Sequence, residues 1–128
     1  MKLGNVLIVL GALLVASGLA PILYIEKGRL PNITSSYILM MFVPAVIALA
    51  PLLYQRARGL DSASIGVVLL AGVVIGTIPF WGPSLDPGMQ MRNDWIGTIV
   101  AHYTAGAIVV LGGLLQLREL MRRRPLAA

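Results

Sequence analysis

Four long runs without a charged residue dominate the chain. They are Leu3–Ile25, Leu30–Gln55, Ser62–Leu85 and Trp95–Leu117, and every Lys, Arg, Asp and Glu lies outside them. A bilayer core about 30 Å thick needs roughly 20 apolar residues at a helical rise of about 1.5 Å per residue. The pattern therefore predicts an all-α integral membrane protein, with four transmembrane helices in an antiparallel bundle at about 3–25, 35–55, 63–81 and 95–117.

The composition limits what such a chain does. Of its 128 residues 58% are hydrophobic and 12% charged, whereas soluble domains carry about 25% charged residues. Four spans leave room for a single domain over 1–128 and for no soluble catalytic domain. The absence of cysteine excludes thiolate and iron–sulfur chemistry. No hydrolase or phosphate-binding motif is present, so we expect no enzyme activity from the chain by itself.

The basic residues predict an orientation. Three, Lys27, Arg29 and Arg92, fall on one side of the predicted membrane, and seven fall on the other: Lys2, Arg56, Arg58, Arg118, Arg122, Arg123 and Arg124. Since cytoplasmic loops carry the excess of Lys and Arg, we expect a multi-pass cell-membrane protein with both termini cytoplasmic and loops 26–34 and 82–94 outside. The charges cluster at helix ends, which argues against nucleic acid as a partner. The arginine-rich C-terminal tail is expected to contact anionic lipid headgroups.

Two short motifs near the N-terminus have alternative interpretations. Ser17-Gly18-Leu19-Ala20 imitates the end of a cleaved signal peptide, but Pro21 follows immediately, so we expect the segment to stay as the first span. Asn32-Ile33-Thr34 is a glycosylation sequon on the predicted outer side. Its closeness to the membrane opposes modification of Asn32, and a chance match is the alternative.

Small residues predict close helix packing in lipid, where packing drives association. They form three stripes at four-residue spacing: Ala12, Ala16 and Ala20; Gly72 and Gly76; and Gly97, Ala101 and Ala105. Pro44 is predicted to kink the second span, either as a fixed packing feature or as a hinge. Gly82-Pro83 is predicted to end the third. No repeat of 34 or 40 residues is present.

His102 is the one ionisable side chain in the predicted spans. It lies about 10 Å into the membrane from the outer surface, and its helical face also carries Thr98, Gly106, Val109, Gly113 and Gln116. We expect this face to point into protein, since exposing an ionisable group to lipid is costly. His102 is a candidate to bind haem, a quinone or a metal. The alternative is a neutral imidazole that is hydrogen-bonded to a neighbouring helix.

Methionines supply the remaining candidate metal ligands. Met40 and Met41 lie near the outer end of the second span, and Met89 and Met91 lie in the outer loop, on the same side as His102. Thioether and imidazole ligands suit Cu(I), so an outward-facing copper site is one hypothesis. Ordinary apolar packing of methionine is the other.

Three functions remain open from the sequence. The first is a non-catalytic accessory subunit that packs against other transmembrane subunits of a larger complex, most often one for respiratory or photosynthetic electron transfer. The second is a haem- or copper-binding membrane protein that uses His102. The third is a small homo-oligomeric transporter or channel hinged at Pro44, although spans without acidic residues argue against coupled transport.

Overall fold

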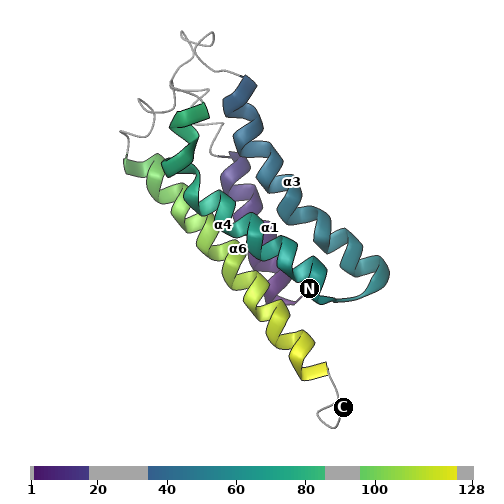
Figure 1. The fold of residues 1–128 in the computed structure, drawn as a ribbon. Helices are drawn as coiled ribbons and strands as arrows, with labels where there is room; N and C mark the ends of the chain where they lie inside the picture. The colour runs from purple at the N-terminus through teal and green to yellow at the C-terminus, as the bar shows by residue number, and fades with distance from the viewer. Residues whose placement is uncertain (1, 18–34, 86–95, 124–128) are drawn as a thin grey trace.

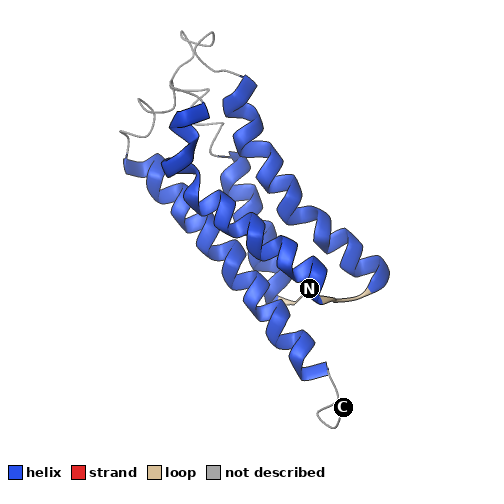
Figure 2. Cartoon of the chain, viewed as in Figure 1, coloured by secondary structure: helices blue, strands red, loops and turns tan. Residues whose placement is uncertain are grey.

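The computed structural model describes residues 2–17, 35–85 and 96–123, and these residues form helices and no strands (Figure 2). Successive helices run in opposite directions, and each packs on the next in a closed ring, with α6 returning to α1 (Figure 1). The helices are α1 (Leu3–Ser17), α3 (Ser35–Arg58), α4 (Ser62–Leu85) and α6 (Ile96–Arg123). The all-helical prediction is thus confirmed for the described residues.

Two of the described helices are long and apolar enough to cross a membrane. The qualifying stretches are Ser62–Trp81 in α4 and His102–Arg123 in α6, and Leu3–Ala16 is a shorter apolar helix. By length and composition, these two stretches are able to cross a membrane, which agrees with the predicted membrane location.

Helix boundaries differ from the predicted ones at three ends. The prediction that Gly82-Pro83 ends the third helix is wrong, because α4 continues to Leu85. Pro83 lacks an N–H donor, and apolar helices accommodate such a loss when their surroundings satisfy the freed carbonyl. α3 ends at Arg58, where Gly59 adopts a φ of 85° and its N–H donates to the Gln55 carbonyl over 2.7 Å. α6 extends six residues past Leu117 to Arg123.

Small and β-branched side chains fill the interior, while many of the largest apolar side chains lie outside. Ala48, Val68, Ile75 and Val109 are fully buried, whereas Leu53 is 72% exposed and Phe80 is 73% exposed. A soluble helical protein of this size rarely exposes so much apolar surface. The arrangement is typical of a bundle whose outer surface meets lipid or other apolar helices.

Glycines set how closely the helices approach. A Cβ on Gly106 would lie 2.7 Å from the Gly72 carbonyl oxygen, and one on Gly112 would lie 2.7 Å from the Gly4 carbonyl oxygen. Both values are below any normal contact, so α6 meets the backbones of α4 and α1 directly at these points. The GxxxG pair Gly72 and Gly76 therefore lies at a close approach of α4 and α6. By contrast, α3 contains no glycine.

The buried positions of the first helical hairpin recur in the second. Those of α1 return 60 residues later in α4, as the pairs Gly4 and Ser64, Ile8 and Val68, Gly11 and Ala71, Ala12 and Gly72, and Val15 and Ile75. Those of α3 return 61 residues later in α6, as Pro44 and Ala105, Ala45 and Gly106, Ala48 and Val109, and Pro51 and Gly112. The two hairpins therefore share a pattern of buried positions, and Gln55 and Gln116 occupy equivalent positions in them.

Candidate functional site at the basic end of the bundle

Four uncharged polar side chains meet at the end of the bundle where α1 and α4 begin and α3 and α6 end. Each helix supplies one: Asn5 from α1, Gln55 from α3, Ser64 from α4 and Gln116 from α6. Chain topology brings them together, because the helices alternate in direction and all four residues lie near the same end. We call this group the polar cluster.

The two glutamines of the polar cluster bond each other reciprocally. Gln55 Nε2 donates to Gln116 Oε1 over 3.1 Å, and Gln116 Nε2 donates to Gln55 Oε1 over 2.8 Å. Each amide also uses a second partner: Gln55 Nε2 donates to Ser64 Oγ over 3.1 Å, and Gln116 Nε2 donates to Asn5 Oδ1 over 2.8 Å. The hydrogen bonds thus join all four helices.

Burial shows what the polar cluster does. Gln116 is 4% exposed and Ser64 is 6% exposed, so both would be costly to leave without partners. Amide and hydroxyl groups of this kind neither titrate near neutral pH nor act as nucleophiles without an adjacent base. Their chemistry in this arrangement is to fix the lateral positions of the helices.

Asp61 begins α4 and links it to α3. The Ser64 N–H donates to Asp61 Oδ1 over 2.7 Å and the Tyr54 hydroxyl donates to Asp61 Oδ2 over 2.9 Å, while the Ser64 hydroxyl donates to the Asp61 carbonyl oxygen. Asp61 is therefore the N-cap of α4. Hydrogen bonds from the Ser64 backbone and from the Ser64 and Tyr54 side chains hold the pKa of the Asp61 carboxyl below its usual value.

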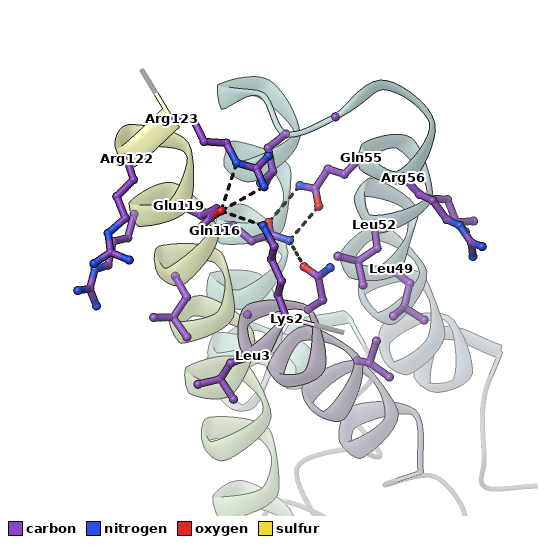
Figure 3. Close-up of a pocket in the computed structure, with 18 residues that line it drawn as sticks. Lys2, Leu3, Leu49, Leu52, Gln55, Arg56, Gln116, Glu119, Arg122 and Arg123 are labelled. Atoms are coloured by element: carbon purple, nitrogen blue, oxygen red, sulfur yellow. Dashed lines mark hydrogen bonds and ion pairs between the residues drawn. The ribbon is translucent and has the colours of Figure 1, made fainter. Parts of the chain in front are cut away.

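Glu119 closes the same end between α1 and α6. Its Oε1 lies 2.8 Å from Lys2 Nζ and 3.1 Å from Arg123 Nη2, so one carboxylate pairs with two cations (Figure 3). The hydrogen bond and charge of Lys2 lower the pKa of Glu119, and Arg123 adds to the effect. The Arg123 pair also supports the turns by which α6 exceeds its predicted length.

A partly open pocket of about 1060 Å³ lies beside the polar cluster, between α1, α3 and α6 (Figure 3). Leucines and one valine form its walls, namely Leu3, Val9, Leu49, Leu52, Leu53, Leu60 and Leu115. Its rim carries five cations and one carboxylate, which are Lys2, Arg56, Arg118, Arg122, Arg123 and Glu119. The pocket therefore combines apolar walls with a strongly basic opening.

His102 lies in α6, and its side chain is buried inside the bundle, with 3% of the residue exposed. Gly106, Val109, Gly113 and Gln116 of the same face are buried with it, as the helical spacing predicted. The side chain of Thr98 lies outside the described residues. No group of three or more His, Asp and Glu side chains able to hold a metal occurs among the described residues. A ligand role for His102 stays a prediction.

The structure describes some of the other residues that the sequence singled out, but not all of them. Pro44 lies inside α3 and is buried, and Ala12 and Ala105 are buried in the core. Ala16 and Gly76 are half-buried. The remaining predicted positions, or their side chains, lie outside the described residues: Ala20, Asn32, Met40, Met41, Met89, Met91, Gly97 and Ala101.

Sequence reasoning missed the polar cluster and the Asp61 cap. The sequence pattern placed Gln116 on the face of His102 and Gln55 at the end of a charge-free run, and it indicated no link between them or to Asn5. A usable signal was present, since in an alternating bundle the residues near positions 5, 55, 64 and 116 reach the same end at similar depth.

No family model, curated protein or solved structure matches the chain.

Proposed function

We propose that the chain is a non-catalytic accessory subunit of a larger membrane protein complex. In this proposal four spans cross the cell membrane, with both termini and the 59–61 loop in the cytoplasm and the 26–34 and 82–94 loops outside. The exposed apolar surface of the described helices supports the membrane location, with Leu53, Leu70 and Phe80 each more than 60% exposed. The excess of Lys and Arg at the polar-cluster end supports the orientation.

The observation that carries the proposal is the polar cluster. Hydrogen bonds between its members join all four helices, so these polar groups serve assembly of the bundle. Close glycine contacts of α6 with α1 and α4 serve the same end. A chain built in this way offers a rigid apolar surface to neighbouring helices, which is what an accessory subunit supplies.

We favour an energy-transducing complex, for respiratory or photosynthetic electron transfer. Assemblies of this class hold many small helical subunits that carry no chemistry of their own. Anionic lipid around the arginine-rich end of α6 is a second expected partner, because basic residues beside a membrane are attracted to it by about 1 kcal/mol each.

Native mass measurement tests the proposal. The chain is tagged at its C-terminus in its own cells, extracted in a mild detergent and weighed intact. We expect a species far above the 13.6 kDa of the chain that contains other membrane subunits in fixed ratio. A stable monomer, or an oligomer of this chain alone, would overturn the proposal.

Single cysteines test the topology separately, because the chain has none of its own. Cysteine at Ser62 should react with an impermeant maleimide only after the cells are opened. Cysteine at Gly88 should react in intact cells. The reverse result would show that the chain has the opposite orientation. Equal labelling of both cysteines in intact cells would exclude the proposed topology.

A second candidate function uses His102 as a cofactor ligand. This candidate is supported by the presence of an ionisable side chain within an apolar helix, since such residues are functional candidates by default. Haem would give a visible absorption band and copper a signal in elemental analysis, both lost in His102→Ala. Purified complex that lacks both, with unchanged behaviour after the substitution, removes this candidate.

A third candidate, a homo-oligomeric transporter or channel, rests on the buried Pro44 as a hinge of α3. Solute flux into liposomes that contain the purified chain would support it. Flux equal to that of empty vesicles would exclude it.

A further inference from the structure

The pocket at the basic end lies where α3 borders α1 and α6. α1 and α4 each meet α6 through glycines, so their backbones approach closely. α3 has no glycine, and its residues that face α1 include Leu49 and Leu52. Branched side chains hold two helices further apart than glycines do. Leu49 and Leu52 form part of the apolar wall of the pocket.

The apolar part is deep enough for a hydrocarbon chain. Leu3 and Val9 of α1 are six residues apart, which corresponds to about 9 Å along the helix axis, and Leu49 and Arg56 of α3 span about 10 Å. The pocket volume of about 1060 Å³ matches the upper end of known small-molecule sites, about 300–1,000 Å³. Its walls are leucine and valine, which offer nothing specific to a polar ligand.

The rim carries more positive than negative charge. Lys2 and Arg123 share the single carboxylate of Glu119. Arg56, Arg118 and Arg122 form no ion pair with any other described residue, and Figure 3 shows the side chains of Arg56 and Arg122 on opposite sides of the pocket, pointing outward and away from each other. The lining therefore includes cations from two helices whose long side chains are free to turn toward an anion at the opening.

We propose that this pocket binds one anionic phospholipid of the inner leaflet. Its phosphate lies at the rim beside the Lys2–Glu119–Arg123 group, where the side chains of Arg56 and Arg122 turn inward to meet it, and an acyl chain lies between α1 and α3. Charge complementarity selects the headgroup, and the leucine walls select a ligand with a hydrocarbon chain. The proposal rests on the membrane location and orientation given above, and it requires no partner subunit.

Native mass spectrometry of the full chain in a neutral detergent tests the proposal. The probes are dioleoyl phosphatidylglycerol, dioleoyl phosphatidylcholine and glycerol phosphate, the last having a headgroup phosphate without acyl chains. We expect one phosphatidylglycerol per chain to survive at concentrations that leave phosphatidylcholine unbound. Glycerol phosphate should not displace it.

Paired arginine variants locate the site. Arg56→Gln with Arg122→Gln should weaken phosphatidylglycerol binding about 25-fold, at roughly fivefold per cation. Arg58→Gln is the matched control, because Arg58 is an exposed arginine of the same helix end but does not line the pocket. It should leave the affinity unchanged.

Three results would each overturn the lipid site. They are equal binding of the two phospholipids, displacement by glycerol phosphate, and a loss in Arg58→Gln as large as that in the pocket variant. The comparison of lipids uses the unaltered chain, so its result does not depend on whether a variant folds. Because the isolated chain is used, failure of the lipid site leaves the proposed assembly into a larger complex standing, and the converse also holds.

Discussion

Gln55 and Gln116 form a reciprocal pair of amide hydrogen bonds, at 3.1 and 2.8 Å, across the centre of the bundle. They come from equivalent places in the two hairpins, at the ends of α3 and α6. Each keeps a further bond to a residue at the start of α1 or α4. The pair joins the two halves of the chain, together with the close contact of Gly4 with Gly112 and the Lys2–Glu119 ion pair.

Replacing one of these glutamines should cost more than its own hydrogen bonds. Gln116→Leu leaves the side-chain amide of Gln55 and the side-chain oxygen of Asn5 without their Gln116 partner, and interhelical hydrogen bonds in membrane proteins contribute about 0.6–1.7 kcal/mol each. We expect the free energy of unfolding to fall by about 1–3 kcal/mol. Chemical unfolding in micelles, followed by circular dichroism, measures it.

The double variant tests whether the pair acts as a unit. Gln55→Leu with Gln116→Leu should cost less than the sum of the two single changes, because neither amide is then left facing a lost partner. Thr104→Val on the exposed face of α6 is the control and should change stability by less than about 0.5 kcal/mol. Simple additivity of the two glutamine changes would show that they do not interact.

Gly106 should tolerate no added methyl group, although its neighbour Gly76 should. A Cβ on Gly106 would meet the Gly76 backbone nitrogen at 2.5 Å, whereas a Cβ on Gly76 would meet the Gly106 Cα at an ordinary 3.6 Å. Relief of the first contact requires α4 and α6 to move apart, which costs about 1–3 kcal/mol. We expect Gly106→Ala to lower the unfolding midpoint in micelles strongly and Gly76→Ala to lower it little.

Gly66→Ala is the control for the glycine prediction. Gly66 also lies in an apolar helix, but a Cβ there meets nothing within 4 Å. The substitution should leave stability unchanged or raise it slightly, since alanine favours helix over glycine. Equal losses at Gly66 and Gly106 would indicate an effect of helix propensity or lipid contact in place of helix crossing.

The sequence predicted those parts of the fold that follow from local pattern. Charge-free runs predicted helices, and the 3.6-residue spacing placed His102 and Gln116 on one buried face of α6. Boundaries were less predictable, because Gly82-Pro83 did not end α4, whose backbone continues through it to Leu85. A proline stops a helix only when the surroundings cannot satisfy the freed carbonyl, and that depends on tertiary context.

The candidate site depended on contacts between helices and was therefore missed. The repeat of buried positions uses similar but seldom identical residues, such as Gly4 with Ser64 and Val15 with Ile75, so identity alone does not reveal it. The pocket is lined by residues of three helices, so no single segment encodes it.

Asp61 should be replaceable by asparagine but not by alanine. The Ser64 N–H donates to the Asp61 side chain over 2.7 Å, and asparagine offers a carbonyl oxygen in the same place. Asp61→Ala removes that acceptor and also the partner of the Tyr54 hydroxyl. We expect faster hydrogen exchange in the first turn of α4 for Asp61→Ala only. Equal exchange in the two variants would contradict the capping role.

Stability should fall in acid partly through Glu119. Lys2 and Arg123 hold the pKa of Glu119 below its ordinary value of 4.5, so the ionised form is favoured in the folded chain. The stabilisation is therefore complete above that ordinary value and is lost as the pH falls through the lowered pKa. Asp61, whose pKa is also lowered, contributes in the same direction, so the comparison is with Glu119→Gln. The melting temperature in micelles should drop less between pH 7 and 3 for Glu119→Gln than for the unaltered chain. Identical drops would show that the Lys2–Glu119 pair does not stabilise the folded bundle.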